Sequence, residues 1–438
     1  MNRLTLSGSP KSLYSAKCFN RLPIVVMLDS VKPAALSFNK TETILGARVR
    51  SSVLWGRGPV WSKIRAWGVR GPGFKSPRPH QESDLHIIFE GRKHMSNEIR
   101  KDYLLNRWVI IASERAKRPT DFPHRPQEKI DTESCPFCPG NEQMTPPAVL
   151  LYLPSDGGIR KEKDADGDRA QNWLVRCFSN LYPALSPRKP ISLARNGLHE
   201  RMDGVGAHEV LVESPRHDEH LGLGKREQTL LVVHAYIDRL KALSRWEYVC
   251  IFRNHGKEAG ASLSHAHSQI IATPMVPSLI SDELTACTTQ TKEGDKCPYC
   301  RIIESERNTP RFIYENPSFI ALAPWASVYP FEFWLLPKRH QHTLLQLREK
   351  EKRDLAQAIN DCMSSLANVL SAPPYSFGFH ISPSRGRHEY YHWHLEVYPK
   401  LTIQAGFENN TGMFINVAPP ELAAESLRES IEEAKKKI

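Results

Sequence analysis

The sequence lacks any apolar run that approaches the ~20 residues a membrane-spanning helix requires. Its best stretch near the start, residues 22–28, is far shorter, and no small-residue cleavage pattern follows it. We therefore expect no membrane segment.

Acidic residues are scarce in residues 1–94, which hold 16 Lys and Arg against 5 Asp and Glu and carry the whole net charge of +11. The rest of the chain is balanced, so its bulk charge predicts no nucleic-acid partner. Residues 1–94 also lack sustained apolar periodicity. A disordered basic arm, a transit peptide and mistakenly translated upstream DNA are the competing interpretations. We favour the third, because Met95 offers a start directly before a credible strand pattern.

Cysteine is sparse: the chain holds nine, and four of them form the pairs Cys135/Cys138 and Cys297/Cys300. The others are scattered and no secretory signal precedes them, so we expect no disulfide framework. This usage is typical of metal or redox sites in a reducing compartment, and we predict a cytoplasmic protein.

Apolar spacing predicts mixed secondary structure after residue 95. Strand patterns cover residues 105–113, 208–214 and 248–256, and two further segments look like paired strands, 312–324 and 331–340. Helical patterns cover residues 226–243, 347–370 and a last segment that opens at Pro420.

The segment Ser264–Gln269 places two imidazoles and an amide at alternate positions, ahead of β-branched and small residues typical of a strand. Alternate side chains of a strand share a face, so His265, His267 and Gln269 should lie together. A metal ligand beside a nucleophile needs this arrangement. Standing alone, the pair would more often be two half-buried, hydrogen-bonded histidines.

The motif does not stand alone, because an ordered set of elements occurs twice. CPFC, a histidine after a proline at His217, and the first histidine of HAH at His265 form one copy. CPYC, His340 and His392 of HWH form the other. The repetition predicts two similar halves, residues 95–285 and 286–438.

Each copy offers the two thiolates and two imidazoles that a structural zinc ion takes in a tetrahedron. The predicted ligands are Cys135, Cys138, His217 and His265 for one site, and Cys297, Cys300, His340 and His392 for the other. His208 could replace His217, and His342 could replace His340. A thioredoxin-like redox pair is the alternative for each CxxC, but proline follows the first cysteine in both copies. Two thiolates favour zinc over iron at the second site.

The two copies differ after the zinc ligand. The first continues as His267-Ser268-Gln269 and follows the glycine-containing loop 254–262, whose amides could approach an anion. The second has His394-Leu395-Glu396. An imidazole beside an anion cradle suggests attack on a phosphoanhydride. Arg115 and Arg118 would suit a diphosphate, although a solvated loop is the ordinary interpretation of such a pair.

In this order CPFC, SPRH, NHG with GAS, and HAHSQ resemble the galactose-1-phosphate uridylyltransferase family of the histidine-triad superfamily, over essentially all of residues 95–438. The resemblance implies an α+β fold of tandem histidine-triad-like units, with an antiparallel sheet and flanking helices, in a homodimer. It implies that His267 takes a nucleotidyl group from a nucleotide sugar, that a sugar 1-phosphate leaves, and that Gln269 binds the phosphoryl oxygens. The substrate contacts that it implies are Arg115, Arg118, Asn180, Asn254, Gly260, Ala261, Ser262, Phe407, Glu408, Thr411 and Gly412.

The chain departs from the best-known bacterial members, which have HPHGQ and lack the second CxxC. Its CPYC and HAHSQ look more like the branch that contains a plant ADP-glucose phosphorylase and archaeal uridylyltransferase-like proteins. The leading hypothesis is a zinc-containing transferase acting between UDP-glucose and galactose 1-phosphate, and the second is an ADP-sugar phosphorylase. The third hypothesis, a non-catalytic zinc scaffold that binds nucleic acid through the basic arm, is opposed by the neutral body.

Overall fold

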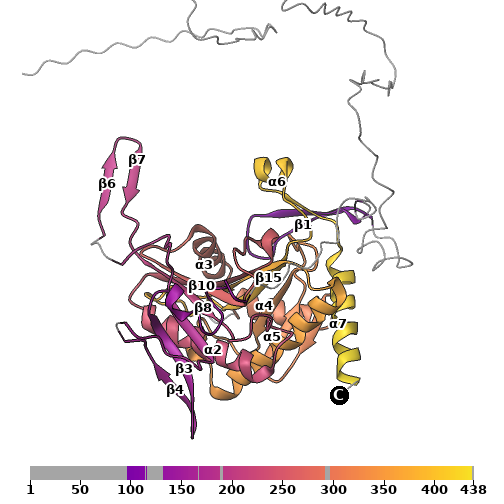
Figure 1. The fold of residues 1–438 in the computed structure, drawn as a ribbon. Coiled ribbons are helices and arrows are strands. Elements are labelled where there is room, and N and C mark those ends of the chain that lie inside the picture. The colour runs from indigo at the N-terminus through magenta and orange to yellow at the C-terminus, as the bar shows by residue number, and fades with distance from the viewer. Residues whose placement is uncertain are drawn as a thin grey trace, which may run out of the picture. The chain divides into compact units, whose positions relative to one another are not determined.

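An eleven-stranded sheet, antiparallel throughout, dominates the described part of the chain (Figure 1). The computed structural model describes residues 96–113, 115, 132–165, 167–187, 191–291 and 296–436. The predictions for residues 1–94 and for Arg118 lie outside the described residues. In sheet order the strands are β11 (Phe312–Glu315), β12 (Phe319–Leu322), β13 (Phe333–Pro337), β15 (His394–Pro399), β14 (Tyr375–His380), β9 (Tyr248–His255), β10 (His267–Thr273), β8 (Ala207–Val212), β5 (Val175–Ser179), β3 (Ala148–Ser155) and β4 (Gly158–Glu162).

The strand order repeats outward from the β14–β9 pair, where Phe377 lies opposite Arg253. On one side β9, β10, β8 and β5 follow one another, and on the other side β14, β15, β13 and β12 do. Both HxH motifs therefore lie one strand from the seam, at the starts of β10 and β15. The sheet thus confirms the predicted α+β class and matches the doubling of the motifs.

One helix follows the same strand in each half. α2 (Arg226–Leu243) connects β8 to β9, and α5 (Glu349–Leu370) connects β13 to β14. Their buried faces, which include Tyr236 and Leu240 on α2 and Leu355 and Ile359 on α5, pack on each other and on the sheet. The C-terminal helix α7 (Pro420–Lys436) packs on α5, and the shorter helices are α3 (Ser278–Gln290), α4 (Pro298–Glu306) and α6 (Gly406–Thr411).

Most predicted elements are present, with one difference in segmentation. Residues 312–324 form two strands, β11 and β12, because the Asn316 side chain accepts hydrogen bonds from the backbone N–H groups of Ser318 and Phe319 at 3.0 and 2.8 Å and turns the chain. Another difference concerns CPYC, which opens α4 with Pro298 at its first position. The proline after the first cysteine is therefore compatible with a helix start, so it does not by itself argue against a redox pair.

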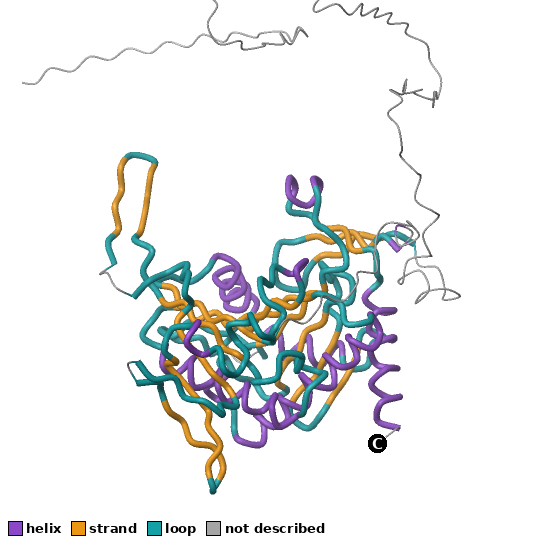
Figure 2. The backbone as a smooth tube through the Cα atoms, viewed as in Figure 1, coloured by secondary structure: helices purple, strands orange, loops and turns teal. Residues whose placement is uncertain are grey.

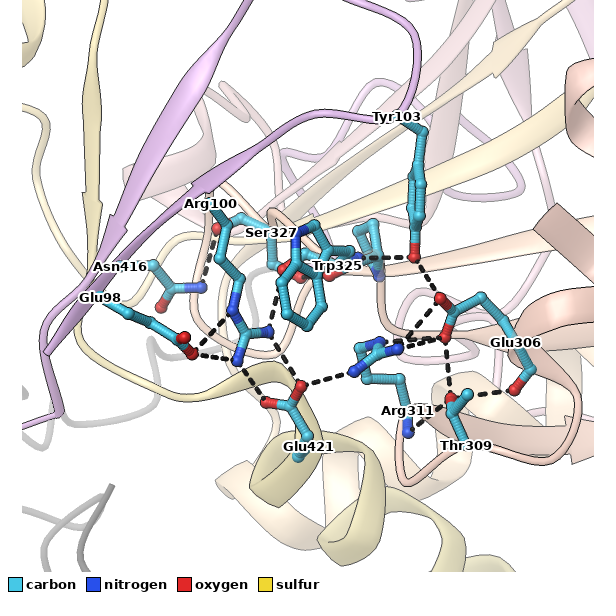
Figure 3. Close-up of polar contacts among 11 residues, drawn as sticks. Glu98, Arg100, Tyr103, Glu306, Thr309, Arg311, Trp325, Ser327, Asn416 and Glu421 are labelled. Carbon is cyan, nitrogen blue, oxygen red and sulfur yellow. Dashed lines mark hydrogen bonds and ion pairs between the residues drawn. The ribbon is translucent and has the colours of Figure 1, made fainter. Parts of the chain in front are cut away.

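The first described strands pack with the second half. β1 (Glu98–Lys101) pairs with β2 (Trp108–Ile111), and β2 pairs in parallel with β16 (Phe414–Asn416). Figure 3 shows how Arg100 of β1 reaches Glu421 of α7, which also pairs with Arg311. Both guanidinium carbons lie over the Trp325 ring, at 3.9 and 4.8 Å from its centroid. Ion pairs and cation–π contacts thus join three distant segments.

The hairpin β6 (Leu193–Asn196) and β7 (His199–Met202) projects from the body of the sheet, as the tube in Figure 2 shows. Its residues are largely exposed. Within the described residues no helix has the length and apolarity to span a bilayer.

Candidate functional site

Four side chains from distant segments converge on a first thiol–imidazole cluster. Cys135 and Cys138 come from a turn, His217 from the loop after β8, and His265 from the residues just ahead of β10. Cys138 Sγ lies 3.3 Å from His217 Nδ1 and 3.4 Å from His265 Nδ1, and the four ligand atoms lie within 4.8 Å of one another. All four residues are buried.

The second cluster repeats this geometry in the other half. Cys300 Sγ lies 3.6 Å from His340 Nδ1 and 3.4 Å from His392 Nδ1, and Cys297 Sγ lies 3.6 Å from His392 Nδ1. His340 is exposed, so this cluster is the more open of the two. The structure therefore brings together both predicted sets of ligands.

Hydrogen bonds prepare the histidines of both clusters for a metal ion. Nε2 of His265 donates to the Ser214 carbonyl, and Nε2 of His392 donates to the Pro337 carbonyl, each at 2.8 Å. Each proton is thereby held on Nε2, so the Nδ1 lone pair faces the thiols. Such outer partners are typical of metal-binding histidines, and the donor set fits a tetrahedral zinc ion. A redox pair alone would not need the imidazoles.

The two alternative ligands lie elsewhere. His342 Nδ1 contacts Ser382 Oγ at 2.8 Å, and His208 Nε2 lies 2.8 Å from Gln269 Oε1. His217 and His340 therefore hold the positions for which these residues were considered as substitutes.

His267 begins β10 as a buried imidazole with one nitrogen committed. Its Nδ1 donates to the His265 carbonyl at 2.8 Å, which leaves the lone pair on Nε2. Burial lowers the pKa of His267 below its usual value and keeps the ring neutral. The Phe137 ring from CPFC packs edge-on against it, with centroids 5.2 Å apart, and also lies 6.1 Å from the His265 ring. His267 is thus positioned by the cluster next to it.

The opposite face of β10 is held by a buried charged network. Ser268 donates to Glu213, which lies 3.0 Å from Arg253 Nε, and the Tyr236 hydroxyl of α2 lies 2.6 Å from Ser268 Oγ. Arg253 and Glu213 are both about fully buried. Ser268, which lies between His267 and Gln269, is therefore held by hydrogen bonds on the opposite face of β10.

Gln269 lies on the same side of β10 as His267, next to strand β8. His208 of β8 contacts its Oε1, and Asn180 Nδ2 lies 3.2 Å from the same imidazole nitrogen. The structure therefore brings Gln269 and Asn180, both predicted site residues, around His208.

The glycine-containing loop follows β9 and makes a short turn, Lys257–Ala259, between Gly256 and Gly260. Both glycines have positive φ, 82° and 85°, which favours glycine. The backbone N–H groups of Gly260 and Ala261 donate to carbonyls inside this loop, at 2.9 and 3.1 Å. A β-carbon on Gly260 would lie 3.8 Å from Asn254 Nδ2, so Asn254 borders the loop, while Ser262 is exposed.

The remaining predicted contacts lie on separate elements. Arg115 is exposed shortly after β2. Phe407, Glu408 and Thr411 lie on α6, and Gly412 ends it with φ 67°. Among the described residues, the side chains of Glu408 and Thr411 form hydrogen bonds only with backbone groups of residues 405–413.

The second half carries His394 at the position that corresponds to His267. His394 is fully buried, its Nε2 lies 3.1 Å from Glu396 Oε1, and the Tyr299 ring of CPYC lies 4.5 Å from its own ring. Tyr299 thus repeats the contact that Phe137 makes with His267. Glu396 thus engages Nε2 of His394, whereas Nε2 of His267 has no hydrogen-bond partner among the described residues.

A third cluster beside His394 was not predicted. Glu283 of α3, His380, His394 and Glu396 present ligand atoms within 4.8 Å of one another. His380 Nδ1 donates to Glu283 Oε1 at 2.8 Å, and its Nε2 lies 3.8 Å from Glu396 Oε2. Burial alone would lower the pKa of His380, but the two carboxylates raise it to about 9. No sequence spacing signals this group, because it depends on Glu283 of α3 meeting His380 of β14 in the folded chain.

The amino-acid sequence is similar to a known protein family and to several characterised relatives. Residues 161–277 match the family model "Galactose-1-phosphate uridyl transferase, N-terminal domain", and residues 251–438 match the corresponding C-terminal domain. The chain is 35% identical to an ADP-glucose phosphorylase of Arabidopsis thaliana, over 77% of this chain and 94% of that protein. It is 31% identical to a galactose-1-phosphate uridylyltransferase of Thermotoga maritima, over 76% of this chain and 98% of that protein.

Solved structures of the same two kinds of enzyme also match the fold. A crystal structure of an Arabidopsis thaliana ADP-glucose phosphorylase with bound ADP-glucose matches with a TM-score of 0.63 at 34% identity, covering 76% of this chain and 99% of that chain. A uridylyltransferase structure matches with a TM-score of 0.59 at 27% identity, covering 77% and 99%. Since the family models and relatives extend over both halves of the described sheet, the chain belongs to the galactose-1-phosphate uridyl transferase family.

Proposed function

We propose that the protein is a hexose-1-phosphate nucleotidylyltransferase in which His267 carries the nucleotidyl group. The single observation that carries the proposal is the state of His267, whose Nδ1 is committed to a backbone carbonyl while its Nε2 keeps a lone pair. A neutral imidazole held in one tautomer is a competent nucleophile toward phosphorus.

In the first step Nε2 of His267 attacks the phosphorus of the nucleotide that bears the base. The N–P bond forms, the P–O bond to the sugar phosphate breaks, and the sugar 1-phosphate leaves with the electron pair. The ring becomes positively charged, and the His265 carbonyl that accepts from Nδ1 at 2.8 Å stabilises that charge. In the second step a phosphate oxygen of the acceptor attacks the same phosphorus, the N–P bond breaks, and His267 returns to its neutral form.

The other predicted residues take supporting roles in this proposal. The Gln269 amide donates to the phosphoryl oxygens without supplying an acid that would expel the histidine. Asn180 and Asn254 bind the nucleotide and phosphate groups beside it. Arg115, shortly after β2, and Phe407 and Glu408 on α6 contact the substrate in this proposal.

Zinc fits both thiol–imidazole clusters, since each offers two cysteine sulfurs and two correctly oriented imidazole nitrogens. At the first cluster it would fix the turn of Cys135, the loop of His217 and the start of β10. It would supply folding free energy there rather than take part in the transfer. Eight free cysteines among the described residues suit a reducing compartment, and we propose a cytoplasmic location.

We propose UDP-glucose as donor and galactose 1-phosphate as acceptor, supported by the family models and by relatives named as uridylyltransferases. One observation favours a second candidate, an ADP-glucose phosphorylase with inorganic phosphate as acceptor: the chain is 35% identical to the Arabidopsis enzyme, against 31% to the Thermotoga uridylyltransferase. Both candidates share the His267 step.

The test is a matrix of two donors and two acceptors. The protein is incubated with UDP-glucose or ADP-glucose, and the product of each acceptor, galactose 1-phosphate or inorganic phosphate, is followed by phosphorus NMR. Consumption of UDP-glucose only when galactose 1-phosphate is present, at catalytic rates, is the expected result. Turnover of ADP-glucose by phosphate establishes the second candidate, and no turnover in any cell of the matrix contradicts both.

A further inference from the structure

We infer that His208 is a positioning residue that fixes the orientation of the Gln269 side-chain amide; this inference rests on the proposed function. The carbonyl and amino ends of a glutamine amide have nearly the same shape, so packing alone does not select between them. Only the amino end can donate to a phosphoryl oxygen. A partner that recognises the carbonyl end is therefore needed.

The protonation state of His208 follows from its backbone contact. The N–H of Ala184 donates to His208 Nδ1 at 3.1 Å, so that nitrogen carries no proton. A neutral imidazole then holds its proton on Nε2, which lies 2.8 Å from Gln269 Oε1. His208 is thus a donor to the carbonyl end of the amide, and the amino end is turned away from it.

The contacts of Asn180 agree with a proton on Nε2 of His208. Its Oδ1 accepts from the Tyr182 backbone N–H at 2.9 Å, which orients its amino end, Nδ2, toward His208 Nε2 at 3.2 Å. Two donors cannot bond to each other, so the His208 proton is directed to Gln269.

Strand pairing makes the contact specific to this register. Gln269 lies opposite Val210, and His208 lies opposite Ile271, so the two side chains are diagonal neighbours on one face of β8 and β10. In the second half Trp334 lies opposite Glu396, and Glu332 lies two residues before Trp334, at the position that corresponds to His208. The donor–acceptor pair of the first half is therefore replaced by two carboxyl groups, Glu332 and Glu396, where burial and the neighbouring Glu396 raise the pKa of Glu332 to about 7.

The predicted consequence is kinetic. Without His208 the Gln269 amide samples both orientations and donates to the transition state only part of the time. We expect His208→Leu to lower kcat for nucleotidylation of His267 by about fivefold to tenfold, as loss of one orienting hydrogen bond implies, with KM for the donor changed by less than about twofold.

A double-mutant cycle tests whether His208 acts through Gln269. The rate of label transfer from a nucleotide sugar to His267 is measured by rapid quench for the wild type, His208→Leu, Gln269→Ala and the double variant. The double variant should be no slower than Gln269→Ala alone. His208→Gln, whose amide can donate from a similar position, should recover most of the rate. His234→Leu on α2 is the matched control and should retain the wild-type rate.

The outcomes separate the two claims. Label on wild-type His267 with multiplicative losses in the double variant, or no recovery by His208→Gln, overturns the role of His208 while the proposed function stands. Equal losses of rate and thermal stability in His208→Leu mark a structural role and also overturn it. No label on wild-type His267 from either donor overturns the proposed function and this inference together.

Discussion

Replacing Arg253 by methionine removes a buried cation next to strand β10 and leaves Glu213 buried without its ion-pair partner. Arg253 Nε lies 3.0 and 3.1 Å from the two Glu213 oxygens, and both side chains are nearly inaccessible, at 1% and 2% exposure. Removal of one partner from such a pair costs about 3–5 kcal/mol, because a carboxylate remains in a site of low polarity. Against a typical stability of about 5–15 kcal/mol, this loss should be plain in a urea transition.

The loss should extend to catalysis, because Glu213 also accepts from Ser268, between His267 and Gln269. The double variant Glu213→Gln with Arg253→Met should recover much of the lost stability, since the buried charge is gone. The matched control is Arg195→Met on the exposed hairpin, where the pair with Glu200 has side chains 71% and 52% exposed. Its loss should be below about 1 kcal/mol. Equal small losses for Arg253→Met and Arg195→Met would show that burial does not strengthen the Arg253–Glu213 pair.

Three further predictions concern the site and its second-half counterpart. His267→Gly should abolish transfer of the nucleotidyl group, while the metal content, measured by plasma emission, stays at the wild-type value. Loss of metal in this variant would show that His267, and not only His265, binds the metal ion. Cys135→Ser should reduce bound zinc from about two ions per chain to about one and lower the melting temperature, since structural zinc contributes folding free energy; unchanged zinc would contradict the assignment of the first cluster. The stability that His380 contributes should be complete below its unfolded pKa near 6.5 and decline as the pH rises through about 9, because its pKa is raised in the fold. Urea midpoints of the wild type and His380→Gln measured from pH 6 to 10 should converge at high pH, and a constant difference would contradict this.

The sequence predicts those features of the site that depend on short local motifs. CPFC and CPYC, the two HxH motifs and the histidines between them are recognisable by residue type and order, and the structure brings each set together. The order of motifs in the two halves also predicts the matching strand order on either side of the β14–β9 seam. Repetition made these predictions strong, since any one motif alone has an ordinary structural explanation.

The contacts that the sequence could not predict depend on register between distant strands. His208 reaches Gln269 only because β8 and β10 pair with Val210 opposite Gln269. A single-residue shift would turn His208 to the other face. The sequence offered His208 only as a possible substitute for His217 in the metal site. The contact between Glu283 and His380 likewise depends on where α3 lies in the fold, and no local pattern predicts it.

The sequence also does not predict the packing between the first and last described elements. Arg100 and Glu421 are separated by most of the described chain, yet they pair beside Trp325 (Figure 3). No periodicity encodes such a contact, because it arises from the parallel pairing of β2 with β16. Phe137 and Tyr299 were visible as the aromatic residue of each CxxC, but their contacts with His267 and His394 appear only in three dimensions.

The central claim is that His267 Nε2 accepts the nucleotidyl group. Its most direct test is intact-protein and peptide mass spectrometry after acid-free quenching of the protein with UDP-glucose or ADP-glucose in the absence of any acceptor. One nucleotidyl group per chain is expected, located on the peptide that contains His267 and discharged when an acceptor is added. A label on another residue, or turnover without any label on His267, would contradict it.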